Sequence, residues 1–216
     1  MIRILIVDDH ELVRTGIARM LADDREIEII GEADSGEAAV EQVRRDPPDV
    51  VLMDLRMPGI GGLEAIHRIL RIDDDIRIIA VTACADDPYP TRVMQAGAHA
   101  YITKGAELKE MLQAVRRAAA GQRYISPEIA QKMALGRVNG DDEAGGVFSE
   151  LSERELQIAT MIVQCQKVQK ISDQLYLSPK TVNTYRYRIF EKLGIESDVE
   201  LTLKALKHGI LDANDV

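Results

Sequence analysis

The sequence is poor in cysteine and contains no long hydrophobic run. Its two cysteines, Cys84 and Cys165, lie far apart and are too few for a disulfide framework, so we expect two reduced thiols. No apolar run approaches the roughly 20 residues that a transmembrane helix requires. No signal-peptide pattern precedes Asp8. We therefore expect a cytoplasmic protein that does not insert into a membrane.

An excess of positive charge is also absent. The 216 residues include 27 Lys and Arg against 36 Asp and Glu, which gives a net charge of −9 and a pI near 5.0. This balance argues against an indiscriminate nucleic-acid binder, but it does not exclude a local basic face. The chain is long enough for two modest domains, each with its own core.

Short apolar runs alternate with amphipathic stretches over the first 120 residues. The apolar runs predict five strands, at Ile2–Val7, Glu28–Ala33, Val50–Met53, Arg77–Val81 and Ala100–Thr103. The amphipathic stretches predict five helices, at about Glu11–Ala22, Glu37–Arg45, Leu63–Leu70, Tyr89–Ala96 and Leu108–Ala120. This alternation is typical of an α/β fold with a doubly wound, five-stranded parallel sheet covered by helices on both faces.

Polar side chains follow four of the predicted strands. Asp8 and Asp9 follow the first strand, Asp54 follows the third, and Thr82 and Lys104 follow the fourth and fifth. Open parallel sheets bind ligands at the carboxyl ends of their strands. The carboxyl ends of the first and third strands should lie side by side. We therefore expect these five side chains to surround one cleft.

Clustered carboxylates repel one another unless a cation neutralises them, and Mg²⁺ with several retained waters best suits this set of oxygen ligands. Mg²⁺ beside a carboxylate and a lysine is suited to phosphoryl transfer. We predict that Asp54 is the nucleophile and that Asp8 and Asp9 hold the metal directly or through water. Lys104 should neutralise the phosphoryl oxygens. The simpler alternative for Asp9 is that it only caps the helix that begins at Glu11.

With these features, residues 1–125 resemble a CheY-like response-regulator receiver domain. Asp54 matches the phosphoacceptor, and the metal positions are Asp8, Asp9, Asp54 and the Arg56 backbone. The switch positions are Thr82, Tyr101 and Lys104. The resemblance implies that a sensor histidine kinase transfers a phosphoryl group to Asp54, with Mg²⁺ as the cofactor. One small departure is Gly105-Ala106, where many receivers carry a polar residue.

The same residues could also serve an aspartate-based phosphohydrolase of the haloacid dehalogenase type. Those enzymes carry a second acid two residues after the nucleophile, whereas Leu55 and Arg56 follow Asp54 here. We therefore do not expect an enzyme.

The C-terminal part of the sequence predicts helices only. A helix with Pro127 at its first position and Ser126 before it fades into residues 136–150, which are rich in glycine and acidic residues and predict a linker. Four helices should follow: from a capping box at Ser152 to about Val163, at about Val168–Leu175, from Ser178 to about Leu193, and from a capping box at Ser197 to near Gly209. We predict a receiver domain over 1–125, a helix and flexible linker over 126–149, and an all-α domain over 150–211.

The short helix, the turn and the capped longer helix predict a helix-turn-helix. Val182, Tyr185, Ile189 and Leu193 recur at helical spacing and should face the core. Residues 178–194 carry a local net charge of +3, and the opposite face holds uncharged hydrogen-bonding side chains between the cations. This pattern favours duplex DNA as the ligand, whereas charge alone would be typical of a solvated helix face.

Residues 150–211 resemble the LuxR-type output domain of the NarL/FixJ family, through Leu151-Ser152-Glu153-Arg154-Glu155, Leu177–Val182 and Lys192-Leu193. The stretch from Cys165 to Leu193 is closer still to the GacA/UvrY type of regulator. The resemblance implies a transcription factor that is controlled by a sensor kinase of the BarA/GacS kind and acts at promoters of small regulatory RNA genes.

The resemblance also implies which side chains meet DNA. It places Asn183, Thr184 and Tyr187 nearest the base edges, and the phosphate contacts at Lys180, Thr181, Arg186, Arg188 and Lys192. With the resemblance, the apolar final helix, which carries Leu201, Leu203, Leu206 and Ile210, should support a homodimer on DNA. Without it, extra core packing would explain these residues equally well. The alternative is a phosphorylation-switched module that acts through protein partners.

Overall fold

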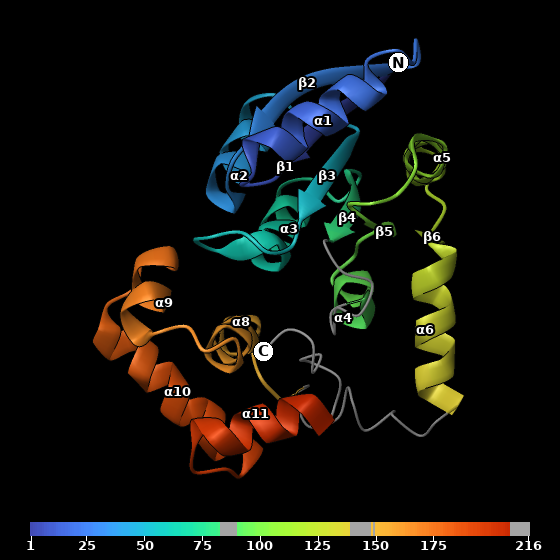
Figure 1. Ribbon diagram of the computed structural model, residues 1–216. Coiled ribbons are helices and arrows are strands. Elements are labelled where there is room, and N and C mark those ends of the chain that lie inside the picture. The colour runs from blue at the N-terminus through green and yellow to red at the C-terminus, as the bar shows by residue number, and fades with distance from the viewer. Residues whose placement is uncertain (83–89, 139–147, 149, 208–216) are drawn as a thin grey trace. The chain divides into compact units, whose positions relative to one another are not determined.

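The computed structural model describes residues 1–82, 90–138, 148 and 150–207 (Figure 1). The chain forms two compact units, Met1–Ala130 and Gln131–Val216, and their division falls later than the predicted receiver end at residue 125. No helix in the described ranges is long and apolar enough to cross a membrane.

The first unit contains a parallel sheet with the strand order β2-β1-β3-β4-β5-β6. Its strands are β1 (Ile2–Val7), β2 (Ile27–Ala33), β3 (Val50–Asp54), β4 (Arg77–Thr82), β5 (Ala100–Thr103) and β6 (Tyr124–Ile125). Its helices are α1 (Glu11–Leu21), α2 (Gly36–Arg45), α3 (Gly61–Ile72), α4 (Pro90–Gln95) and α5 (Leu108–Ala119). The doubly wound α/β fold is therefore confirmed.

In the described part of the chain the sheet has six strands, whereas the sequence predicted five. The chain turns at Gly121, whose φ of 71° favours glycine, and returns to the sheet edge as β6. Tyr124 and Ile125 pair with Ala100 and Tyr101 of β5. Two residues are too few to show a period along the sequence, so the pattern could not predict this strand.

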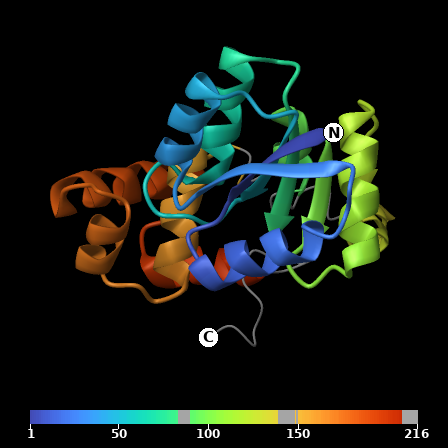
Figure 2. The same ribbon diagram turned by 90° about the horizontal axis from the view of Figure 1, so that it is seen from above.

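Alternate residues along the central strands fill the two faces of the sheet. On one face, Ile4 and Ile6 of β1 join Ile17 of α1 and Met111 of α5 in a buried cluster. Leu5, at an intervening position of β1, and the residues of β3 are also buried. Helices α2 and α3 contact each other. Figure 2 shows helices on both sides of the sheet. Burial of both faces explains why β1 and β3 are continuously apolar runs.

The strand order reverses between β1 and β3, which places a ligand-binding edge at their carboxyl ends. Val7, the last residue of β1, pairs with Met53 of β3. Asp8 therefore leaves its strand beside Asp54. On the other side of β3, the pairing of Thr82 with Thr103 brings Lys104 to the same edge.

The second unit is helical. It contains α8 (Glu153–Val163), α9 (Val168–Gln174), α10 (Pro179–Leu193) and α11 (Asp198–Lys207), and α6 (Pro127–Val138) crosses the division between the units. Helix α10 contacts α8 and α9, and α11 contacts α8. The predicted helix-turn-helix is therefore present as α9 and α10.

The helix caps follow the sequence signals closely. Ser152 and Glu155 form the predicted reciprocal capping box, and Ser178 accepts a hydrogen bond from the backbone N–H of Thr181. Gly194 ends α10 in the left-handed region with a φ of 62°. The predicted box at Ser197 forms only in part, because Ser197 accepts from Glu200 N–H while the Glu200 carboxylate accepts from the backbone N–H of Glu196.

The core side of α10 differs slightly from the prediction. Val182, Ile189 and Leu193 are buried as expected, but Tyr185 is only half-buried and Phe190 is 8% exposed in its place. The start of α6 also differs in detail. The helix begins at Pro127 as predicted, but the buried Ser126 hydroxyl has no hydrogen-bond partner within the described part of the chain.

Candidate functional site

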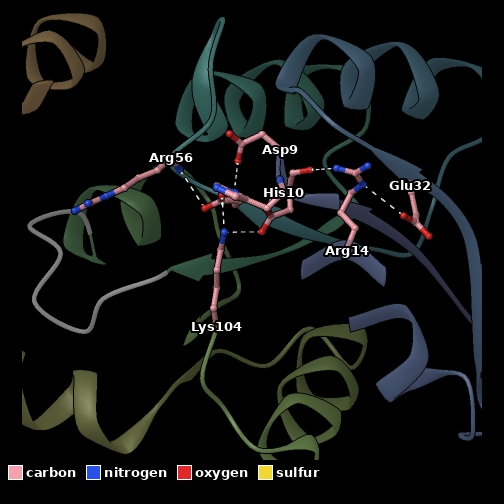
Figure 3. A network of polar contacts seen from close by, with 8 residues as sticks. Asp9, His10, Arg14, Glu32, Arg56 and Lys104 are labelled. Atoms are coloured by element: carbon pink, nitrogen blue, oxygen red, sulfur yellow. Dashed lines mark hydrogen bonds and ion pairs between the residues drawn. The ribbon is translucent and has the colours of Figure 1, made fainter. Parts of the chain in front are cut away.

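The acidic pocket lies at the carboxyl edge of the sheet, where Lys104 joins two buried aspartates. Its Nζ lies 2.8 Å from Asp54 Oδ2 and 2.6 Å from Asp8 Oδ2 (Figure 3). Asp8 is only 1% exposed and Asp54 only 2%. The sequence-based prediction that these three side chains meet at one site is therefore correct as geometry.

Backbone groups fix the two aspartates in place. Asp8 Oδ1 accepts a hydrogen bond of 2.9 Å from the backbone N–H of His10, and Asp54 Oδ1 accepts one of 3.2 Å from that of Arg56. Helix α3 approaches the loop after Asp54 so closely that a Cβ on Gly62 would lie 2.0 Å from the Asp54 carbonyl oxygen. Only glycine allows this approach, so the loop that carries Asp54 has little freedom.

Asp9 does not cap helix α1. The N-cap position belongs to His10, which makes no side-chain cap hydrogen bond. Asp9 Oδ1 instead lies 2.9 Å from His10 Nδ1, on the pocket side of the loop. The capping alternative for Asp9 is therefore wrong, and its carboxylate is available to the pocket.

The ionisation of Asp54 is shifted by its surroundings. Burial raises the pKa of its carboxyl group from 3.8 to about 6, although the hydrogen bond and charge of Lys104 oppose this rise. Burial by itself would lower the pKa of Lys104, but its bonds to Asp54 and Asp8 outweigh burial and raise it. The pocket thus holds a charged lysine beside a carboxylate that is unusually basic.

The donor set fits a hard divalent cation. Asp8, Asp9, His10 and Asp54 each offer a ligand atom, and these atoms lie within 4.8 Å of one another. Apart from the Lys104 ammonium, 2.6 Å from Asp8 Oδ2, and the His10 imidazole, 2.9 Å from Asp9 Oδ1, these two buried oxygens have no partner in the described part of the chain. Carboxylate oxygens are the ligands that Mg²⁺ prefers.

Two side chains around the pocket were missed by sequence reasoning. Arg14 donates a 2.6 Å hydrogen bond to the backbone carbonyl of Asp8, and its Nε lies 3.4 Å from Glu32 Oε2 (Figure 3). Glu37 on α2 accepts a 3.0 Å hydrogen bond from the backbone N–H of Ile60, in the loop after Asp54. Arg14 contacts a loop six residues before it and Glu37 a loop 23 residues after it. Neither contact follows a helical or strand period, so no such pattern could have indicated them.

The structure describes the side chain of only one of the two predicted switch residues, Tyr101. Tyr101 on β5 is completely buried, so its ring already occupies an inward position. Thr82 ends β4 beside Thr103, and the side chain of Thr82 falls outside what the structure describes, as do Cys84 and Tyr89.

Helix α10 presents a polar surface opposite its buried face. Lys180, Thr184 and Arg188 are exposed, and Tyr187 is 70% exposed, whereas Thr181 and Asn183 are half-buried. The Arg188 guanidinium lies 6.0 Å from the centre of the Tyr185 ring, which can hold its stem against the helix. These side chains occupy the face that the sequence pattern predicts for DNA.

Arg186 and Lys192, the other two predicted phosphate contacts, are both engaged within the domain. Arg186 makes a two-point ion pair with Asp198 of α11, in which Nε lies 2.7 Å from Asp198 Oδ1. Lys192 Nζ lies 2.6 Å from the buried carboxylate of Glu155 in the capping box of α8. Their charges join α10 to its neighbouring helices, whereas Lys180 and Arg188 are exposed.

Comparison with known proteins agrees with this combination of a pocket and a helix-turn-helix. The family described as response regulator receiver domain matches residues 4–116, and the family of bacterial regulatory proteins of the luxR type matches residues 149–205. The chain belongs to the two-component response regulators that join a receiver domain to a LuxR-type DNA-binding domain.

Two similar proteins indicate which type of response regulator the chain resembles. The chain is 62% identical to response regulator GacA of Pseudomonas viridiflava, covering 99% of this chain and 100% of that protein. It is 54% identical to response regulator UvrY of Escherichia coli strain K12, covering 99% and 97%. The chain therefore resembles response regulators of the GacA/UvrY type, and its receiver and LuxR-type DNA-binding domains make it a regulator of transcription.

A solved structure supports the fold over nearly the whole chain. RcsB from Salmonella enterica serovar Typhimurium, solved bound to the promoter rprA, has a TM-score of 0.66 at 23% identity and covers 94% of this chain and 98% of its own.

Proposed function

We propose that Asp54 accepts a phosphoryl group from a sensor histidine kinase of the BarA/GacS kind. The observation that carries this proposal is the Lys104 ammonium, which lies 2.8 Å from Asp54 Oδ2 and 2.6 Å from Asp8 Oδ2. A fixed cation at this point faces the space where the oxygens of an incoming phosphoryl group would lie. Its charge offsets theirs in the transition state without reorganisation.

The chemistry follows from the basicity of Asp54. A carboxylate oxygen of Asp54 attacks the phosphorus atom, and the bond from phosphorus to the kinase histidine breaks, leaving an acyl phosphate on Asp54. A carboxyl group with a pKa of about 6 is still mostly ionised at neutral pH, yet more basic than an ordinary aspartate. We propose that the chain acts as an acceptor of this group and not as an enzyme with a substrate of its own.

The cofactor in this proposal is Mg²⁺. Asp8, Asp9, Asp54 and the backbone carbonyl of Arg56 would hold it. When bound, it supplies positive charge that neutralises phosphoryl oxygens. The ligand atoms of Asp8, Asp9 and Asp54, which lie within 4.8 Å of one another, support this assignment.

Thr82 and Tyr101 form the proposed switch. A phosphoryl group on Asp54 brings about −1.5 to −2 charges and strong acceptor oxygens. Thr82 follows Val81, which pairs with Asp54 of the neighbouring strand, and in this proposal its hydroxyl donates to these oxygens. Because Tyr101 is completely buried in the present conformation, phosphorylation would hold its ring inward and would not need to turn it.

The DNA-binding surface in this proposal is the exposed face of α10. Base edges would be contacted by Asn183, Thr184 and Tyr187, and backbone phosphates by Lys180, Thr181 and Arg188. The exposure of Tyr187 and Arg188 supports this division, and so does the cap at Ser178, which fixes the start of the helix.

We propose that the chain binds DNA as a homodimer through α11. Leu201 is buried in the domain, but Leu203 is 61% exposed and Leu206 is 36% exposed on the same helix, and Ile210 lies outside the described residues. Exposed leucines at this spacing favour a partner helix. We also propose the domain limits 1–125, 126–149 and 150–211, and the family matches over residues 4–116 and 149–205 support this division.

The relationship to GacA and UvrY suggests promoters of small regulatory RNA genes as the targets and the cytoplasm as the site of action. Genome-wide DNA binding of the full chain, compared with Asp54→Asn, tests the whole proposal. We expect enrichment at a small set of promoters that Asp54→Asn loses. Equal enrichment for both proteins would contradict phosphorylation control. An absence of any enriched promoter would favour a switch that acts through protein partners.

A further inference from the structure

Tyr176, in the turn between α9 and α10, has a backbone conformation that is unfavourable for a bulky residue. Its φ of 51° lies in the left-handed region, where the Cβ atom meets the backbone. The turn closes α9 as a Schellman motif, in which the backbone N–H of Leu177 donates a 3.0 Å hydrogen bond to the carbonyl of Ser172. The N–H of Tyr176 donates a longer one, of 3.4 Å, to the carbonyl of Asp173. Glycine is the usual residue at this position, and the chain uses it at Gly194, where α10 ends.

Neighbouring side chains hold the turn in this conformation. The Ser172 hydroxyl donates a 2.6 Å hydrogen bond to the carbonyl of Leu177. On the other side of Tyr176, the Arg154 guanidinium of α8 donates one of 2.7 Å to the carbonyl of Leu175. The turn is therefore fixed on both sides, and the strain at Tyr176 cannot be relieved by a small movement. Strain that the surrounding structure maintains in this way is concentrated at functional sites.

The ring of Tyr176 does not repay this strain within the domain. The side chain is 81% exposed, and it is the most exposed aromatic side chain in the part of the chain that the structure describes. A ring in water contributes almost no hydrophobic stabilisation. The tyrosine therefore costs stability in the free protein, which indicates that its side chain serves a contact with another molecule.

The place of the turn in the fold identifies this molecule as DNA. Tyr176 lies two residues before Ser178, the N-cap of α10, and the exposed Lys180 follows in the first turn of that helix. In a helix-turn-helix, the N-terminal residues of the second helix contact base edges in the major groove. A residue just ahead of that helix therefore lies beside the sugar–phosphate backbone that borders the groove.

The chemistry of the side chain fits the same ligand, because tyrosine hydroxyls are among the donors that bind DNA phosphates. We propose that the Tyr176 hydroxyl donates a hydrogen bond to a phosphate of the DNA backbone beside the groove that α10 enters. This inference rests on the DNA-binding surface of α10 proposed above. The strained turn then holds the hydroxyl in place before DNA binds, so that little side-chain freedom is lost on binding.

Two substitutions separate the hydroxyl from the backbone strain. Tyr176→Gly removes both, so the variant should have a higher Tm than wild type and yet bind DNA more weakly. Tyr176→Phe removes only the hydroxyl, so its Tm should be unchanged while its affinity for duplex DNA falls about fivefold or more. Since phosphates carry no sequence information and the tyrosine carries no charge, the loss should be equal on all duplexes and the salt slope should stay unchanged.

Cys165→Gly is the matched control for the relief of strain. Cys165 follows α8 in the same kind of turn, with a φ of 57°, and it is exposed. This variant should gain Tm as Tyr176→Gly does but should bind DNA as wild type does. Thermal unfolding followed by circular dichroism measures the Tm of each full-length protein under reducing conditions. Fluorescence anisotropy measures the affinity for a random-sequence duplex and for a promoter fragment recovered by the genome-wide experiment.

DNA affinity that is unchanged in Tyr176→Phe would overturn the inference, and so would a stabilised Tyr176→Gly protein that binds DNA as wild type does. Arg188→Ala separates this outcome from a failure of the proposed α10 surface. If Arg188→Ala binds more weakly and Tyr176→Phe does not, only the Tyr176 contact is wrong. If Tyr176→Phe binds more weakly and Arg188→Ala does not, the contact stands and the α10 surface is wrong. A wild-type protein that binds neither duplex would contradict both.

Discussion

Asp54 combines burial, charge and basicity in one side chain. Its pKa rises from 3.8 to about 6 because burial disfavours the ionised carboxylate. A raised carboxyl pKa means that the folded state is favoured at pH values below 3.8 and loses that advantage as pH rises through about 6. At neutral pH, ionised Asp54 therefore lowers the free energy of unfolding when no metal is bound.

Asp54→Asn should stabilise the metal-free protein at neutral pH, because the amide removes this buried charge. The expected gain is about 1–3 kcal/mol, and it should shrink as pH falls from 7.5 towards 4.5. Thermal unfolding in EDTA across this range measures it. Mg²⁺ should remove the difference by stabilising wild type more than the variant. A gain that does not change with pH would show that burial of the charge is not its cause.

Lys104 is the only cation within ion-pair distance of both Asp8 and Asp54 among the described side chains. In Lys104→Ala, two buried carboxylates would face each other without a neutralising charge. We expect the metal-free variant to be less stable than wild type and to gain a larger increase in Tm from Mg²⁺. Lys109→Ala, an exposed lysine on α5, is the control and should behave as wild type. Equal Mg²⁺-induced shifts in wild type and Lys104→Ala would contradict the proposed role.

Some contacts of individual side chains could be predicted from the sequence, and others could not. Asp8, Asp54 and Lys104 could be predicted together because each follows a strand, and the order of strands in a parallel sheet brings those ends to one edge. The roles of Arg186 and Lys192 could not be predicted. Their positive charge is visible in the sequence, but the carboxylates that bind them lie on other helices.

Helices and strands were predictable wherever a pattern was long enough to show a period. The bounds of β1, β5, α8 and α10 match the sequence-based ranges, because apolar runs and capping residues mark both ends. Strand β6 is too short for such a pattern, and its pairing with β5 depends on where α5 ends. Local sequence patterns therefore predict the longer helices and strands, whereas the formation of β6 depends on tertiary contacts.

Helix α10 allows phosphate contact and base contact to be separated. Arg188→Ala removes an exposed charge, so we expect weaker binding to specific and random duplexes alike and a salt slope reduced by roughly one unit. Asn183→Ala removes no charge, so the slope should stay unchanged, while one base position loses roughly 1–3 kcal/mol of preference. Titrations of operator and scrambled DNA at several salt concentrations measure both. Equal loss of slope in both variants, with unchanged sequence preference, would place the DNA-binding face elsewhere.

The ion pair between Lys192 and Glu155 joins α10 to the capping box of α8. Because the Glu155 carboxylate is 5% exposed, Lys192→Met should leave it without its cation and lower the stability of the helical domain by about 1–2 kcal/mol. Thermal unfolding followed by circular dichroism measures this loss. Arg188→Ala is the control and should unfold as wild type does, since Arg188 is exposed. If Lys192→Met is as stable as wild type and binds DNA with a reduced salt slope, Lys192 contacts a DNA phosphate and not mainly Glu155.

The two compact units of the whole molecule each contain one of its two candidate sites. The unit over Met1–Ala130 contains the pocket, and the unit over Gln131–Val216 contains the helix-turn-helix. A response regulator of this kind must convert a phosphoryl group in the first unit into a change of DNA binding by the second. In the proposed function, phosphorylation at Asp54 is the event on which every later step depends.

Intact-mass measurement after incubation with acetyl phosphate and Mg²⁺ tests that event most directly. Asp54→Asn keeps the shape of the side chain but removes the nucleophilic oxygen charge, and Asp46→Asn serves as an exposed control. We expect wild type and Asp46→Asn to gain the mass of one phosphoryl group, and Asp54→Asn to gain none. A stoichiometric phosphoprotein formed by Asp54→Asn would contradict the assignment.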